Sequence, residues 1–158
     1  MKTRVNSFTI ILLFFMMSCS SSKTAVKVIT EITQKVESKD FTINVNSANP
    51  QRMKQIFLTS EYDLRTKNDS AFAFLPYFGV AYITDYGSND GGIKFAEPMT
   101  DYFITPNKKS TGWDIRFKVK SKQTLYDFYL NVFNNGSTIF TVSSFQRDAI
   151  TFNGEVKR

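Results

Sequence analysis

The chain has 158 residues, with 20 Lys and Arg against 14 Asp and Glu, so its formal net charge is +6. It contains one Cys and no His, which excludes Cys/His zinc sites, Cys-His nucleophile pairs, the Ser-His-Asp triad and haem ligated by His. At this length we expect one domain at most.

The first 18 residues have the layout of a secretory signal peptide. Lys2 and Arg4 precede an apolar run from Phe8 to Met17, and Cys19 follows shortly after it. The run is about ten residues long, which is too short for a helix that spans a bilayer. We therefore predict that residues 1–18 are a signal peptide that is removed from the mature protein.

The end of this segment, MMSC (Met16 to Cys19), resembles the lipobox of bacterial lipoproteins. In that motif the Cys thiol receives a diacylglycerol, and cleavage before the Cys frees an amine for a further acyl chain. Two or more acyl chains hold a protein stably on a membrane, whereas one chain binds only marginally. We expect a lipid on Cys19, and the alternative is a signal anchor or an ordinary signal peptide with an accidental Cys.

The residues after Cys19 bear on which membrane holds the protein. Ser20 is not the Asp that resembles an inner-membrane retention signal, and residues 20–23 lack the acidic tract that resembles a surface-export signal. We therefore expect an outer-membrane protein facing the periplasm. Residues 19–23 are then the lipidated Cys with its tether, and residues 24–158 form a single β-rich domain with an N-terminal helix.

An amphipathic helix is predicted over residues 24–38, because apolar side chains recur there at helical spacing. An isolated helix of about 15 residues is marginal in water, so we expect its apolar side to pack on the sheet that follows. The alternative is a stalk that lies on lipid. The apolar positions are Ala25, Val28, Ile29, Ile32 and Val36.

The rest of the chain alternates between apolar and polar residues, with frequent turn signals that predict roughly eight to ten short strands. Asn134-Asn135-Gly136 between two such runs is a strong hairpin signal. Residues 72–83 are apolar on both faces and are predicted to be the most buried stretch, with Pro76 at a bulge, edge or corner. The predicted strands cover residues 41–46, 52–59, 62–66, 70–75, 93–95, 113–122, 125–133, 138–144 and 150–156.

These strands have short connections and no helical crossovers, so a parallel sheet is not expected. A small antiparallel up-and-down β-barrel leaves no free edges and is the fold we expect. A two-sheet sandwich is the alternative.

Several blocks in order along the chain resemble a family of small Gram-negative lipoproteins known as domain of unknown function 4251. The resemblance covers residues 38–157 and implies a lipocalin-like β-barrel that is secreted or tethered to a membrane. It assigns no catalytic residue, ligand or cofactor. The blocks are LPYFG (75–79), DYG (85–87), GGIKF (91–95), DIRFKVK (114–120), NNG (134–136) and ITFNGEV (150–156).

A cavity for an apolar ligand is one candidate site, because a barrel of about eight strands either fills its interior or holds one small ligand. Aromatic residues make up 15% of the chain, and core packing is their usual role. Both interpretations stay open at this point. The candidate lining residues are Phe72, Phe74, Phe78, Tyr82, Phe95, Phe117 and Phe128.

A stripe of cations on one strand is a second candidate, for lipid phosphates, lipopolysaccharide or an acidic glycan. Its alternative is an ordinary solvated strand face that protects an edge. Nucleic acid is not an expected partner, since no aromatic residues interleave with the charges. The stripe consists of Arg116, Lys118, Lys120 and Lys122.

Three weaker signals involve oxygen-bearing side chains. The loop 85–92 offers Asp85, Asn89 and Asp90 to a Ca²⁺ ion, but it departs from an EF-hand loop, and a tight Gly-rich turn is the favoured explanation. Asp69-Ser70-Ala71 resembles a short O-glycosylation acceptor at Ser70, and a hairpin turn is the simpler explanation. Carboxylates such as Asp85 with Asp90, or Glu97 with Asp101, are candidates for an acid and base pair, but their spacing in the sequence fixes no distance between the side chains.

We therefore expect a non-catalytic lipoprotein without a cofactor. Two functions remain open: a carrier or sensor of an apolar molecule, and an interaction or structural module of the envelope that uses its outer surface. A carboxylate-based hydrolase is a distant third.

Overall fold

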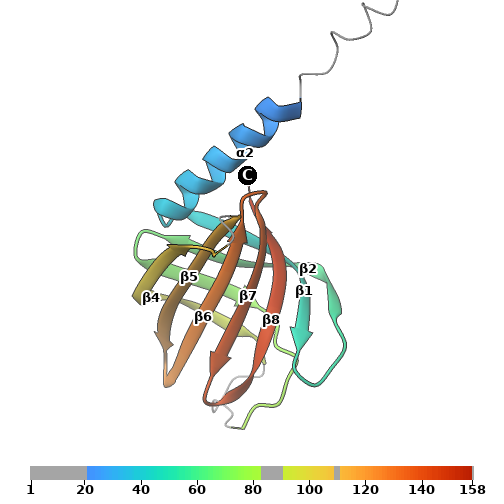
Figure 1. Ribbon diagram of the computed structural model, residues 1–158. Helices are drawn as coiled ribbons and strands as arrows, with labels where there is room; N and C mark the ends of the chain where they lie inside the picture. The colour runs from blue at the N-terminus through green and yellow to red at the C-terminus, as the bar shows by residue number, and fades with distance from the viewer. Residues whose placement is uncertain (1–20, 83–90, 109–110, 158) are drawn as a thin grey trace, which may run out of the picture.

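The structure, a computed structural model, describes residues 21–82, 91–108 and 111–157. In these residues one helix, α2 (Ser21–Glu37), precedes eight strands (Figure 1). The strands are β1 (Phe41–Pro50), β2 (Ile56–Lys67), β3 (Ser70–Leu75), β4 (Ile93–Pro106), β5 (Gly112–Ser121), β6 (Thr124–Phe133), β7 (Ser137–Ser144) and β8 (Arg147–Val156).

The strands form a closed antiparallel barrel. Each strand pairs with the next one along the chain, and β8 returns to pair with β1. The predicted up-and-down barrel is confirmed, and the sandwich alternative is wrong. Closure gives every strand two neighbours, although residues 56–62 of β2 have no partner in β3.

Two strands differ from the prediction. The predicted strands 52–59 and 62–66 are one strand, β2, which is irregular where residues 58–61 lie opposite a single residue of β1. The predicted strand 93–95 is only the start of β4, which has 14 residues. A bulge near Asp101, whose φ is +52°, breaks the alternation in β4 and hides the strand in the sequence.

Large apolar side chains fill the middle of the barrel. Phe117 on β5 and Phe128 on β6 are paired in register and are both 2% exposed. Their rings stack with centroids 4.8 Å apart, and the rings of Phe140 and Phe152 stack at 5.2 Å. Such pairs add stability beyond the area that they bury.

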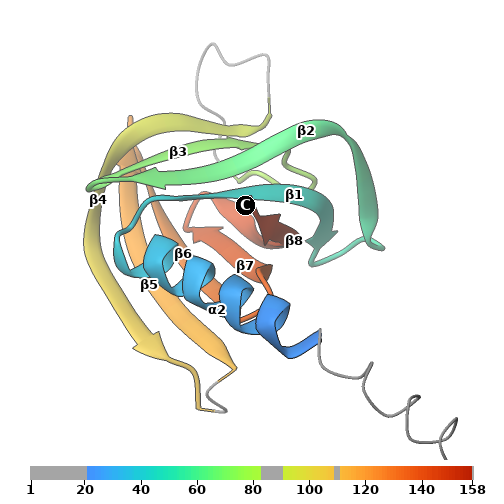
Figure 2. The same cartoon turned by 90° about the horizontal axis from the view of Figure 1, so that it is seen from above.

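The helix α2 closes one end of the barrel (Figures 1 and 2). Ile32 and Val36, one turn apart on its inner side, are fully buried in the core. The side chain of Ile32 reaches Gly136, which has a φ of +93° in the turn between β6 and β7. Both the predicted helix and the Asn134-Asn135-Gly136 turn are confirmed, and the helix packs on the barrel as expected.

Candidate functional site

Three of the predicted cavity residues lie inside the barrel and pack against one another. Phe95 meets the edge of Phe128 at 5.8 Å between ring centroids and stacks on Tyr126 at 5.7 Å. Phe128 in turn stacks on Phe117. Phe78, beyond the end of β3, is half-buried against the same core. These rings occupy the interior by contacting each other.

The prediction is wrong for Phe72, Phe74 and Tyr82, which do not face the interior. In β3 the inward positions are held by Ala71, Ala73 and Leu75, so the two Phe side chains that alternate with them point outward. Phe74 is 42% exposed and Tyr82 is 59% exposed. The prediction that residues 72–83 are the most buried stretch is also wrong, because residues 79–82 are exposed. Apolar residues occupy both faces of β3, so the sequence does not show which face is inward.

The outward rings of β3 are covered by cations rather than by core. The guanidinium carbon of Arg65 lies 4.8 Å from the centroid of Phe72. The Nζ atom of Lys94 lies 4.6 Å from the centroid of Phe74, whose ring also stacks on Tyr62 at 5.4 Å. Contacts of this kind stabilise exposed rings by about 0.5–1 kcal/mol each.

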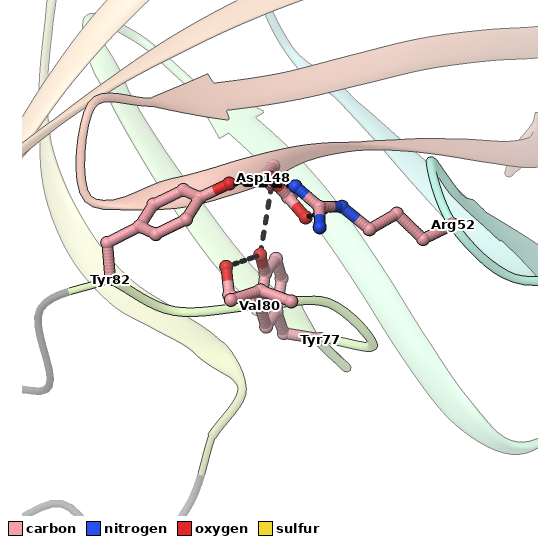
Figure 3. Close-up of polar contacts among 5 residues, drawn as sticks. All are labelled: Arg52, Tyr77, Val80, Tyr82 and Asp148. Carbon is pink, nitrogen blue, oxygen red and sulfur yellow. Dashed lines mark hydrogen bonds and ion pairs between the residues drawn. The ribbon is translucent and has the colours of Figure 1, made fainter.

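A polar cluster lies at the start of β8 (Figure 3), which is at the end of the barrel opposite α2 (Figure 1). Asp148, at the start of β8, has a side chain that is only 8% exposed. One carboxylate oxygen accepts a hydrogen bond of 2.5 Å from Tyr82, and the other forms an ion pair with Arg52 Nε at 3.1 Å. The Tyr77 hydroxyl bridges the carbonyls of Val80 and Asp148 at 2.9 and 3.0 Å. We call Arg52, Tyr77, Tyr82 and Asp148 the mouth cluster.

The mouth cluster ties three segments together. Backbone hydrogen bonds join Tyr82 N to Gln146 O and Asp148 N to Val80 O, so the segment after β3 lies beside the start of β8. Arg147 adds a hydrogen bond to Gly91 O at 2.9 Å. The β1–β2 connection is held through Arg52. This end of the barrel is thus fastened by side chains from widely separated parts of the chain.

The tyrosines of the mouth cluster are held in the protonated state. Burial raises the pKa of Tyr77, and the hydrogen bond to Asp148 raises the pKa of Tyr82. A tyrosine that serves as a nucleophile or base needs the opposite change, a lowered pKa. Both hydroxyls act as hydrogen-bond donors that fasten the mouth.

The predicted cationic stripe lies on the outer side of the barrel, but two of its four residues contact other side chains of the protein. Arg116 lies over the Tyr129 ring at 4.8 Å, and Lys118 pairs with Asp101 at 3.0 Å. The hydrogen bond to Asp101 raises the pKa of Lys118. Lys120 is exposed on β5, and Lys122 lies in the turn beyond it with a φ of +52°.

The remaining predicted groups are placed as follows. Ser70 is half-buried at the start of β3, and its neighbour Asp69 pairs with Lys39 at 2.9 Å. Glu97 lies in β4 opposite Ala71, while Asp101 is engaged by Lys118. Cys19, Asp85, Asn89 and Asp90 lie outside the described residues.

The structure also contains a groove on the outer surface that the sequence did not indicate. Asn46 is an extra residue in β1: Val45 pairs with Tyr62 and Gly154, and Ser47 pairs with Phe57 and Asn153. This β-bulge and the irregular residues 58–61 of β2 separate the two strands locally. A groove of about 550 Å³ lies along the separation. Its polar lining residues are Thr42, Asn44, Asn46, Thr59, Ser60, Glu61, Asp63, Arg65 and Lys157.

A second, apolar section of about 380 Å³ shares Asn46 with this groove and lies over β1, β2, β7 and β8. Phe57 is 77% exposed there and Ile139 is 41% exposed. Around them Gln55 and Asn153 both donate hydrogen bonds to the buried hydroxyl of Ser47, at 2.9 and 3.0 Å. We call the two sections together the bulge groove. An exposed aromatic ring surrounded by fixed amide groups can bind a complementary surface.

A family model described as Domain of unknown function (DUF4251) matches residues 23–156. The chain belongs to the DUF4251 family. A crystal structure of a DUF4251 family protein from Bacteroides eggerthii is similar with a TM-score of 0.63 and 15% sequence identity, over 82% of this chain and 87% of that one. At this identity the likeness shows the fold alone. No curated protein matches the chain significantly.

Family membership confirms the resemblance inferred from the sequence blocks. The match begins at residue 23, so in this DUF4251 chain it includes most of α2 as well as the barrel. In the described part of the chain, α2 is not long and apolar enough to cross a membrane.

The bulge groove was not predicted from the sequence, because a bulge depends on which residues of two strands pair. Asn46 continues the regular alternation of β1, and the exposed Phe57 looks like one more apolar strand residue. The stretch Asn44-Val45-Asn46-Ser47-Ala48-Asn49, rich in short polar side chains, is the one local signal of an irregular strand.

Proposed function

We propose that this DUF4251 protein is an outer-membrane lipoprotein that faces the periplasm and acts without catalysis by binding an envelope protein in its bulge groove. The MMSC motif and the single Cys support the anchor. Acyl chains on Cys19 would keep the folded domain permanently at one membrane. Its binding partner would then be a protein of the same envelope.

The packing of the interior is the observation that carries this proposal. The stacked rings of Phe117 with Phe128 and of Phe140 with Phe152 lie where an apolar ligand would otherwise sit. The helix α2 covers one end of the barrel, and the mouth cluster fastens the other. A ligand inside would have to separate buried aromatic rings, each a large apolar side chain. The outer surface is therefore favoured over the interior.

A protein fits the bulge groove better than a small apolar molecule does. Phe57 is an exposed aromatic side chain next to Ile139, with the amides of Gln55 and Asn153 at its rim. Aromatic anchors within a polar rim are typical of protein interfaces. The polar section around Asn46 adds amide, hydroxyl and charged groups of both signs, which suit a peptide-bearing surface.

The test places a photo-crosslinking benzoylphenylalanine at residue 57 of the full-length protein in living cells. We expect one discrete adduct that proteinase digestion removes, because the ring would sit inside the interface. The matched control is the same probe at Leu125, which is 40% exposed on β6, where no such adduct is expected. A proteinase-resistant adduct would indicate a glycan, and equal labelling at both positions would contradict the proposal.

The Cys19→Ala variant tests the anchor in the same cells. We expect it to leave the membrane fraction and to lose the crosslink at residue 57. Retention in the membrane fraction would contradict the lipid anchor. Native mass spectrometry of residues 20–158 checks the interior, where a stoichiometric adduct lost on denaturation would favour an internal ligand instead.

A further inference from the structure

The N-terminal half of helix α2 carries apolar side chains that the barrel does not cover. Ile32 and Val36 face the core. At 100° per residue, Val26 lies about 80–120° from them around the helix axis, and Ile29 lies about 20–60° from them but nearer the N-terminus. Val26 is 63% exposed and Ile29 is 39% exposed. Both views of the fold show the N-terminal part of α2 extending past the rim of the barrel (Figures 1 and 2).

Four neighbouring residues on this part of α2, Val26, Ile29, Thr30 and Thr33, carry no charge. Thr30 donates its hydroxyl to the carbonyl of Val26 at 3.0 Å, and Thr33 donates to the carbonyl of Ile29 at 2.7 Å. The hydroxyls are thus used within the helix, so the side chains present their methyl groups. We call Val26, Ile29, Thr30 and Thr33 the outer strip of α2. A solvated helix face normally carries charged and polar groups that contact water.

The charged residues of α2 lie beside the outer strip. Lys35 pairs with Glu31 at 3.0 Å and donates a hydrogen bond to the carbonyl of Lys157, which fixes both charges against the barrel. Lys27 is exposed at the N-terminal end of the strip. A lysine next to an apolar strip favours a surface of anionic lipid by about 1 kcal/mol.

The position of Cys19 decides what the outer strip contacts. The helix begins at Ser21, two residues after Cys19. Two extended residues span at most about 7 Å, so a lipid on Cys19 holds the first turn of α2 at the headgroups. From this geometry we infer that the outer strip of α2 lies on the lipid surface of the anchoring membrane. This inference rests on the proposed lipid anchor.

This placement also orients the barrel. The end covered by α2 faces the membrane, and the mouth cluster with the turns at 50–56 and 121–124 points away from it. The bulge groove lies on the side of the barrel, where it stays open to a partner. Interfacial helices of this kind bury one apolar side at the boundary between headgroups and acyl chains.

The experiment uses the lipidated protein in vesicles of phosphatidylethanolamine and phosphatidylglycerol. Cys19 is the only Cys, and its sulfur carries the lipid, so one engineered Cys is the only thiol open to labelling. Val26→Cys carries an environment-sensitive NBD fluorophore. Lys122→Cys, in the turn at the far end of the barrel, is the matched control.

We expect the label at residue 26 to brighten severalfold on vesicles and to be quenched by nitroxide-labelled lipids. The label at residue 122 should show neither change. Equal signals at the two positions, on protein that floats with the vesicles, would overturn the inference while leaving the anchor intact. Protein that fails to float would instead contradict the anchor. Because the vesicles hold no other protein, any shielding of residue 26 must come from lipid.

Discussion

Tyr102 has a ring that stabilises the fold and a hydroxyl group that destabilises it. It lies on β4 with its ring stacked on Phe117, and Lys39 Nζ lies 4.8 Å from the ring centroid. Its hydroxyl is buried and has no hydrogen-bond partner. Burial raises the pKa of Tyr102 from 10.0 to about 12. The ring contributes packing, while the hydroxyl contributes an unpaired polar group that costs free energy.

Replacing Tyr102 by Phe should therefore leave the protein as stable as before, or more stable by up to about 1 kcal/mol at pH 8. A pKa that is raised in the folded state gives stability that is complete below pH 10 and is lost as the pH rises toward 12. Ionisation of Tyr102 should therefore lower the free energy of unfolding of the wild type by about 1 kcal/mol between pH 8 and pH 11. Urea unfolding at both pH values measures the effect, which Tyr102→Phe should remove. A variant that loses 1 kcal/mol or more at pH 8 would show that the hydroxyl has a partner.

At the scale of elements, the close approach of β1 and β8 at the bulge depends on one glycine. A Cβ built on Gly154 would lie 2.3 Å from the carbonyl oxygen of Asn44 and 2.9 Å from a methyl group of Ile43. The first contact is with backbone, which cannot move aside without shifting the strand. This glycine lets β1 carry its extra residue while the barrel stays closed.

Gly154→Ala should thus lower the free energy of unfolding by about 1–3 kcal/mol, because the added methyl group forces the two strands apart. Gly91→Ala is the matched control, since a Cβ there meets nothing within 4 Å, and it should change stability by less than about 0.5 kcal/mol. Thermal unfolding followed by circular dichroism compares the two. Equal stability of both variants would show that β1 and β8 are not in contact at the bulge.

The elements also show what the sequence could predict. The regular strand β5 and the Asn134-Asn135-Gly136 hairpin were predicted because alternation and turn chemistry are local properties of the chain. The long strand β4 was missed because Pro98 and the bulge at Asp101 interrupt its alternation. The bulge groove was not predictable, because it depends on which residues of β1 and β2 pair, and strand register is fixed by tertiary packing.

The same reasoning explains the errors in the candidate site. Phe117 and Phe128 were placed inside because their strands alternate clearly, whereas β3 is apolar on both faces and gives no sign of which face is inward. There the small side chains of Ala71 and Ala73 take the inner positions, next to an interior already occupied by rings. The aromatic content indicated a core, but it did not indicate which rings belong to it.

For the whole molecule, the two ends of the barrel are closed by different means. Buried apolar contacts from α2 close one end, while hydrogen bonds and an ion pair around Asp148 close the other. Salt does not weaken the apolar contacts of α2, whereas it does weaken the ion pair between Asp148 and the partly exposed Arg52. The helix therefore has two tasks, since one side stabilises the barrel and the other is proposed to contact lipid.

These two tasks can be separated by single substitutions on the two sides of α2. Ile32 is fully buried on the inner side, so Ile32→Ala should lower the free energy of unfolding by about 2–4 kcal/mol. Val26 is 63% exposed on the outer strip, so Val26→Ala should cost less than about 1 kcal/mol in the absence of lipid. Urea unfolding of residues 20–158 measures both. Similar losses in the two variants would mean that α2 packs on the barrel through a different side, and the outer strip would then not be free to contact a membrane.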